Sequence, residues 1–236
     1  MKVYFVTSGL REEMEVIRHV RPPRLLCSYW YFKNRSLQEF CNAIGYRPEI
    51  MLDSGAYSAF TKGRTVNIFD YMRYIEGNVE HIARYVALDV IGDPFTTKAY
   101  YEIMRHKGFE PIPVFHCGDD LSVMQHYVTS GARVVALGNT VRIPDKDEVA
   151  RWCKEIHELH PDISLHLLGS SSHKIMDCGA VASCDSSTWY VKAVNGYPES
   201  IPGKTRPSKL ARAEANMIQI MEVFNEVPIP ADNCCS

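Results

Sequence analysis

Short apolar segments rich in β-branched residues alternate with amphipathic segments along the whole chain. Several of the apolar segments are continuous, as in parallel strands that are covered on both faces. The predicted strands are 2–7, 25–30, 49–53, 85–89, 112–116, 134–137, 164–168 and 181–184. Apolar residues at helical spacing predict helices between them. These helices are 11–18, 36–44, 67–80, 96–106, 121–129, 145–160, 172–177 and 208–225.

Eight alternating βα units are typical of a closed barrel or of a doubly wound open sheet. The count of eight, with a helix after each strand, favours a (β/α)8 barrel of the TIM type. No glycine-rich dinucleotide fingerprint follows the first strand, which disfavours the open Rossmann sheet. A length of 236 residues fits one α/β domain better than two, so residues 1–236 are predicted to form a single barrel.

Composition places the chain among ordinary globular proteins, with 46% hydrophobic and 23% charged residues. No apolar run approaches the roughly 18 to 20 residues that span a bilayer. The first residues have no cleavage-like secretory signal. The sequence therefore predicts a cytoplasmic protein without a membrane contact.

The cysteines are scattered and form no C-x-x-C pair, which gives little support to a structural zinc site. They stand at positions 27, 41, 117, 153, 178, 184, 234 and 235. Most lie in apolar segments and are expected to be reduced core residues. The pair Cys234 and Cys235 has no explanation in the sequence. We expect no metal and no cofactor.

A net charge of −2 limits the nucleic-acid contacts that the chain can make. Proteins that grip long stretches of nucleic acid usually carry a basic excess, so any such contact must be local. Lys192, Lys204 and Arg206 in the late basic segment are the candidates for contacts to a nucleic-acid backbone. A solvated surface explains them equally well.

Candidate chemistry lies where the predicted strands end, because reactive groups of such barrels project from the carboxyl ends of the strands. Asp53, Asp89, His116 and Asp185 stand at four of these ends. Gly138 and Gly169 stand at two others. Each aspartate alone is equally typical of a turn or a helix cap, and His116 alone is equally consistent with a structural role. Together they predict one polar mouth.

Crowded carboxylates do not all ionise easily, so their pKa values should separate. One can then attack while another holds or accepts a proton, which suits glycosyl transfer through an oxocarbenium-like transition state. Tyr57, Phe60 and Trp189 are candidates for a stacking face under a base, with core packing as the alternative. Ser170–Ser172 is at least as typical of a helix cap as of a phosphate site.

Six strand-end segments, in order, resemble short elements of one known family, the tRNA-guanine transglycosylase (queuine tRNA-ribosyltransferase) superfamily, with its phage-type branch that inserts 7-deazaguanine into DNA. The segments are Asp53-Ser54-Gly55-Ala56-Tyr57, Ala87-Leu88-Asp89 with Pro94, Val114-Phe115-His116-Cys117-Gly118, Ala136-Leu137-Gly138-Asn139, His166-Leu167-Leu168-Gly169 and Ser183-Cys184-Asp185-Ser186. The family's zinc motif is absent, and the length leaves no room for its RNA-binding domain.

The resemblance implies roles for these residues. Asp185 would be the covalent nucleophile and Asp53 the general acid/base. The base would be held by Asp89, His116, Gly138, Tyr57 and Gly169. The implied partners are a nucleic acid, with DNA slightly ahead of tRNA, and a free guanine or 7-deazaguanine base. A homodimer or a partner protein stays open.

The sequence thus predicts a pentosyltransferase that exchanges guanine in a nucleic acid for a 7-deazaguanine. Three alternatives remain at this point. One is a nucleoside or glycoside hydrolase that uses the same aspartates. The second is a metal-dependent barrel hydrolase that uses Asp53, Asp89, His116 and His173. The third is a non-catalytic partner subunit.

Overall fold

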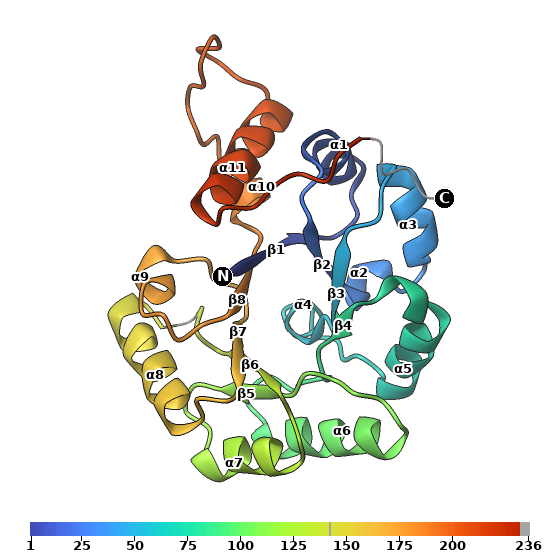
Figure 1. The fold of residues 1–236 in the computed structure, drawn as a ribbon. Coiled ribbons are helices and arrows are strands. Elements are labelled where there is room, and N and C mark those ends of the chain that lie inside the picture. The colour runs from blue at the N-terminus through green and yellow to red at the C-terminus, as the bar shows by residue number, and fades with distance from the viewer. Residues whose placement is uncertain (142, 232–236) are drawn as a thin grey trace.

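The computed structural model describes residues 1–141 and 143–231. Eight strands alternate with helices, and the helices surround the strands (Figure 1). The strands are β1 (Lys2–Thr7), β2 (Arg24–Ser28), β3 (Glu49–Asp53), β4 (Arg84–Tyr85), β5 (Val114–His116), β6 (Val134–Gly138), β7 (Ser164–Leu167) and β8 (Ser183–Ser186). Each lies within, or shifted by a few residues from, a predicted strand, and β1 and β3 match their predicted bounds.

All neighbouring strands are parallel, in the order β4-β3-β2-β1-β8-β7-β6-β5. The segments after β4 and before β5, the two strands at the ends of this order, pair at an isolated parallel bridge between Val86 and Ile112. There the Ala87 amide donates to the Ile112 carbonyl, and the Ile112 amide donates to the Tyr85 carbonyl, each at 2.8 Å. This seam closes the sheet, so the predicted TIM-type barrel is confirmed and the open doubly wound sheet is excluded.

The helices on the outside follow the predicted amphipathic segments. They are α1 (Arg11–Val20), α3 (Leu37–Ile44), α5 (Ile68–Gly77), α6 (Pro94–His106), α7 (Leu121–Thr129), α8 (Lys146–Leu159), α9 (His173–Met176) and α11 (Lys209–Val223). A capping box between Ser36 and Glu39 starts α3, and Asp120 caps α7 through the Ser122 amide. Local capping therefore sets several of these boundaries.

Three short helices directly after strands were not predicted, and one turn of 3-10 helix stands where the predicted helix 67–80 ends. They are α2 (Tyr29–Phe32), α4 (Ala56–Phe60), α10 (Thr188–Val194) and η1 (Val79–His81). Segments of three to seven residues are too short for a helical period to show in the sequence. Three of them matter for function, because α2, α4 and α10 start at the strand ends.

Successive side chains of a strand point to opposite faces, so each strand contributes to an apolar layer under the helices and to another inside the barrel. In β1, Val3 and Phe5 face the helices, whereas Tyr4 joins the cluster inside the barrel with Leu26 and Met51. Burial of one Leu or Phe side chain stabilises the fold by roughly 1.5 to 3 kcal/mol. The filled interior lies below the carboxyl ends of the strands, which leaves the chemistry at the mouth.

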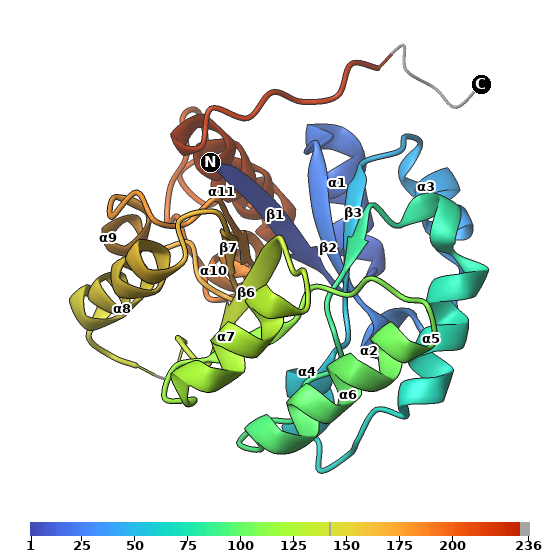
Figure 2. The same cartoon turned by 60° about the horizontal axis from the view of Figure 1, so that its bottom comes forward.

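The C-terminal segment contacts the amino ends of β1 and β2, at the opposite end of the barrel from the cavity. The Ile229 amide donates to the Arg21 carbonyl at 2.9 Å, and Arg21 Nε donates to the Ile229 carbonyl at 2.8 Å. Glu226 contacts Arg24 at the start of β2 and accepts from the Val3 amide. Figure 2 shows this segment passing α1, and Figure 1 shows the loop between α10 and α11 projecting from the body.

The six cysteines within the described ranges are thiols that take part in no disulfide bond. Cys27, Cys41, Cys153 and Cys184 are buried, as predicted, whereas Cys117 and Cys178 are partly exposed. Cys234 and Cys235 lie outside the described residues. None of the helices in the described ranges is long and apolar enough to cross a membrane.

Candidate functional site

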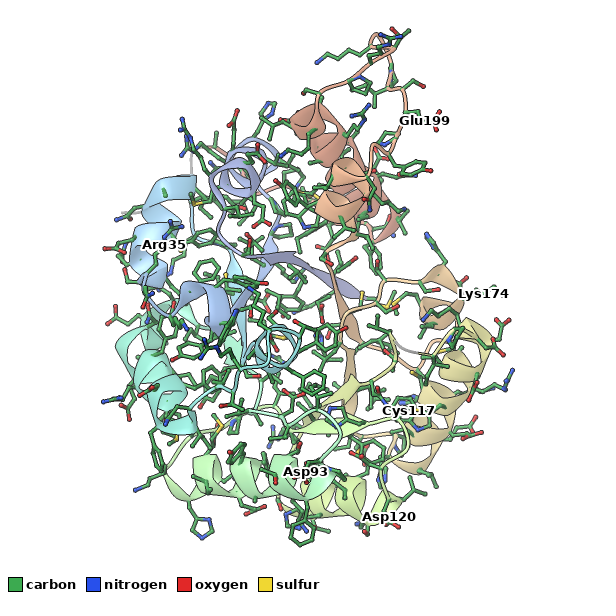
Figure 3. The ribbon with its side chains drawn as sticks, turned by 180° about the vertical axis from the view of Figure 1, so that it is seen from behind. Arg35, Asp93, Cys117, Asp120, Lys174 and Glu199 are labelled. Carbon is green, nitrogen blue, oxygen red and sulfur yellow. The ribbon has the colours of Figure 1, made fainter. Side chains whose placement is uncertain are left out.

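A cavity of about 1070 Å³ opens at the carboxyl ends of the strands. All eight strands contribute to its wall, through their last residues or through the loop or short helix that follows. Asp53, Asp89, His116 and Asp185 all line it, from β3, the segment after β4, β5 and β8. Figure 3 shows Asp93 and Cys117, which also line the cavity, on neighbouring loops away from Glu199 of the projecting loop. The predicted polar mouth therefore exists.

Asp53 ends β3 inside this mouth, in register with Ser28 of β2. The Gly55 amide donates to Asp53 Oδ2 at 2.8 Å. Gly55 has a φ of +75°, and a Cβ there would lie 2.5 Å from Trp30 Cβ, so the turn requires glycine. Burial and the neighbouring Asp89 raise the pKa of Asp53 to about 7, with a smaller contribution from Asp185 that the Gly55 hydrogen bond opposes. This carboxyl can take up and release a proton near neutral pH.

His116 lies between two carboxylates. Its Nε2 is 3.4 Å from Asp89 Oδ2, and its Nδ1 is 3.5 Å from Asp119 Oδ2. Burial lowers the pKa of His116, but Asp119 and Asp89 together outweigh it and raise the pKa to about 9. Ser54 Oγ donates to the other oxygen of Asp89 at 3.2 Å. His116 is therefore an imidazolium at neutral pH.

Gly138 makes room for that ring. It pairs with His116 across β5 and β6, and a Cβ at Gly138 would lie 2.6 Å from His116 Cδ2. Any side chain there would push the imidazole from its place between the carboxylates. The glycine predicted to contact a ligand thus has a clear role in placing His116.

Asp185 is held through both oxygens. Oδ1 lies 3.3 Å from His166 Nε2, and Oδ2 accepts from the Gly169 amide at 3.0 Å. His166 is fully buried, and its Nδ1 lies 2.9 Å from Ser183 Oγ. The Tyr4 ring packs against the same imidazole in a T-shaped arrangement. Asp185 is consequently fixed in orientation at the cavity wall.

Four residues were not predicted as site residues: Glu13, Ser28 and Asp119, which line the cavity, and the buried His166, which contacts Asp185. Glu13 lies in α1, is 6% exposed and accepts hydrogen bonds from Thr7 Oγ1 and the Ser8 amide, each at 2.8 Å. It sits in the first turn of a helix, where an acidic residue is ordinary. Asp119 was visible, because it follows His116 by three residues in a strand-end loop.

Most of the predicted ligand-binding residues do reach the cavity. Asp89, His116, Gly138, Gly169 and the half-exposed Tyr57 line it beside Asp53 and Asp185. Their assignment to a base stays untested.

Other predicted residues lie elsewhere. Trp189 is fully buried in the core, where its Nε1 donates to the Val6 carbonyl, so it offers no stacking face. Phe60 is half exposed but does not line the cavity. Lys192, Lys204 and Arg206 are exposed and also outside it. Their contact to a nucleic acid stays a prediction.

The metal-dependent alternative finds no support in the geometry. Within residues 1–141 and 143–231, no three His, Cys, Asp or Glu side chains are grouped so that they could hold a metal ion. His173 starts α9 and is absent from the cavity wall. Ser172 precedes it without a side-chain cap, and Ser171 donates to Ser186 Oγ at 2.9 Å.

No family model and no curated protein matches this sequence. Solved structures do. A protein described as a fructose-1,6-biphosphate aldolase from Coccidioides immitis has a TM-score of 0.56 and 14% identity over 95% of this chain and 89% of its own. The YdjI aldolase of Escherichia coli K12 has the same score and identity over 95% and 90%. This likeness shows a shared fold.

A third similar structure is the carboxyl transferase domain of Rhizobium etli pyruvate carboxylase with 3-hydroxypyruvate. Its TM-score is 0.55 at 10% identity, and the match covers 97% of this chain and 49% of that one. The three matches belong to TIM-type barrels of different reactions. At sequence identities this low, the matches show only that the fold is shared.

These findings correct the resemblance to the transglycosylase superfamily and the base-exchange function drawn from it. No family model supports it, and the similar structures are aldolases and a carboxyl transferase. The hydrolase alternatives gain no support either. The physical reason is that the matched segments are very short. Aspartates and glycines at strand ends form turns and a polar mouth in any such barrel, as the Asp53–Gly55 turn does here.

Proposed function

We propose that the chain is a lyase-type enzyme that breaks or forms a carbon–carbon bond next to a carbonyl group by acid–base catalysis. One observation carries this proposal: a partly buried carboxyl, Asp53, and a histidine held between two carboxylates, His116, line one cavity at the mouth of the barrel. A base and an acid on opposite sides of a bound carbonyl compound are the minimum that such a reaction needs.

The reaction balances with these two groups alone. The Asp53 carboxylate takes the proton of a β-hydroxyl, and that C–O bond becomes a carbonyl. The Cα–Cβ bond breaks, and its electron pair forms an enol whose oxygen takes a proton from His116. After the aldehyde leaves, the enol carbon takes the proton from Asp53, and the enol O–H returns its proton to His116.

The protonation states suit these roles. Asp53, with a pKa of about 7, is a base that also regains its proton at neutral pH. His116, with a pKa of about 9, is charged when the carbonyl oxygen needs a proton. Asp185, fixed by His166 and Gly169, is placed to accept a hydrogen bond from a substrate hydroxyl. The aldolases among the similar structures support the choice of reaction only through their common fold.

Deuterium exchange tests the enol step without knowledge of the natural substrate. The full chain is incubated in D₂O with unphosphorylated α-hydroxyketones and β-hydroxycarbonyl compounds, and loss of the α-hydrogen is followed by proton NMR. We expect exchange above the buffer rate. Asp53→Asn should lower it about 10² to 10⁴-fold, the usual contribution of a general base.

Asp120→Asn is the matched control. Asp120 caps α7, does not line the cavity, and asparagine caps as well as aspartate. Its exchange rate should equal that of the wild type. Absence of exchange from every compound, or wild-type exchange in Asp53→Asn, would overturn the proposal.

A further inference from the structure

The floor of the cavity is strongly acidic. Six carboxylates line the cavity, from Glu13, Asp53, Asp89, Asp93, Asp119 and Asp185, against one imidazole, His116. Among the described residues that line the cavity there is no lysine or arginine. A phosphate or carboxylate substrate would meet like charges at short range in a partly desolvated site. The electrostatics thus disfavour anionic substrates.

One buried hydroxyl on this floor, that of Ser28, faces the cavity beside Asp53. Ser28 is 5% exposed and lines the cavity. It lies close enough to Asp53 to lower the pKa of that carboxyl. Its Oγ nevertheless makes no hydrogen bond of normal geometry within the described ranges. A hydroxyl has one donor and two acceptor positions, so Ser28 can interact with Asp53 and still meet a polar group of the bound molecule.

Above the floor, large apolar side chains make up part of the rim. Five side chains of the cavity wall form this apolar part, from the loops after β1 and β6 and from the short helices α2, α4 and α10. Each has 46% to 59% of its surface exposed: Leu10, Tyr31, Tyr57, Val141 and Val191. We name these residues the collar. Exposed apolar side chains that ring a pocket mark a place where an apolar body binds.

We propose that the substrate is a non-anionic amphipathic molecule. Its head carries hydrogen-bond donors, uncharged or cationic, that meet Asp53, Asp89, Asp185 and Ser28. Its aromatic or aliphatic body lies against the collar. This inference rests on the proposed function for the site but concerns binding alone, so it names the substrate class and not the reaction.

Binding of four matched probes to the full chain, measured by titration calorimetry at pH 7.5, tests this. 3-Phenylpropane-1,2-diol has a neutral head, 2-phenylethylamine a cationic one and phenyl phosphate an anionic one, whereas propane-1,2-diol lacks the ring. The ring-bearing diol or the amine should bind at least about tenfold more tightly than the phosphate, and the diol more tightly than its ring-free analogue by a similar factor. Equal or tighter binding of phenyl phosphate would overturn the acidic-floor argument.

Two variants on one helix test the collar. Val191 lines the cavity, whereas Val194 is similarly exposed on α10 but lies outside its wall. Val191→Lys should lower the ratio of the diol affinity to the phosphate affinity about tenfold. Val194→Lys should leave this ratio unchanged. An equal effect of both variants would overturn the collar assignment.

Arg142 follows the collar residue Val141 in the sequence and lies outside the described residues, so Arg142→Gln is a necessary arm. If Arg142→Gln binds the diol more tightly than the phosphate, as expected for the wild type, the proposal is supported. If the wild type prefers the phosphate and Arg142→Gln loses that preference, the proposal is overturned. These titrations need no turnover. If the probes bind with the expected preference but no deuterium exchange occurs, only the proposed lyase reaction is overturned. If exchange occurs without that preference, only the proposed substrate class is overturned.

Discussion

The two sides of the barrel mouth place the same residue type in opposite circumstances. On the side of β3 to β5, Asp53 accepts one short backbone hydrogen bond and faces Asp89, and its pKa rises to about 7. On the side of β7 and β8, both oxygens of Asp185 are engaged, by His166 and the Gly169 amide. Position at a strand end therefore does not define a role. The partners of each carboxylate do.

The largest expected effect separates these two aspartates. Asp53→Asn should lower the exchange rate about 10² to 10⁴-fold, because it removes the proton acceptor. Asp185→Asn should lower the exchange rate only about tenfold and leave its pH dependence unchanged. The pH dependence of the exchange rate of both variants checks this. A larger loss in Asp185→Asn would reverse the assignment of the two sides.

Stability gives the same comparison a second readout. A folded-state pKa of about 7 against the ordinary 3.8 means that the native state holds its proton more tightly than the unfolded state. Asp53 therefore costs stability increasingly as pH rises from about 4 to 7. Asp53→Asn should gain stability relative to the wild type over this window, as urea denaturation at pH 4 and pH 8 would reveal.

The next effect concerns His116. Its raised pKa contributes stability that is complete below 6.5 and is lost as pH rises through about 9. His116→Asn should cost about 3 kcal/mol at pH 6, because it leaves Asp89 and Asp119 without their cation. The difference between variant and wild type should shrink at pH 10 in urea denaturation. A difference independent of pH would mean that the imidazole is neutral.

The smallest effect is expected from Gly138→Ala, which places a methyl group against His116. Overpacking of this kind costs about 1 to 3 kcal/mol, and the shifted ring should lower the apparent pKa of His116 in proton NMR. Gly77→Ala is the control, because no atom lies within 4 Å of a Cβ there and the site is helical. It should raise stability by about 0.5 to 1 kcal/mol. An unshifted His116 titration in Gly138→Ala would show that the ring tolerates the methyl.

The barrel could be predicted from the sequence because its signal is repeated eight times. Each strand is an apolar run bounded by polar residues, and a shift of two residues, as at β8, leaves the count intact. The cavity-facing aspartates could be predicted for the same reason, since strand ends converge in this fold.

The pairings at the site could not be predicted. His166 and Asp185 are 19 residues apart in sequence, and their contact depends on the register of β7 and β8. Trp189 looked like a stacking residue, but the unpredicted helix α10 turns it into the core. The resemblance to a known family failed at the same level. It compared residues at strand ends, whereas function depends on what each side chain touches across the barrel.

The seam between β4 and β5 links the architecture to the proton chemistry. Within the described residues, backbone pairing between the two strand segments is confined to the stretch around Val86 and Ile112. Asp89 follows the first of these segments and His116 ends the second, so their ion pair crosses the same gap. The imidazolium that would protonate a substrate therefore also holds β4 and β5 together. Loss of its charge would weaken the barrel wall at the pair of strands that has the fewest backbone hydrogen bonds.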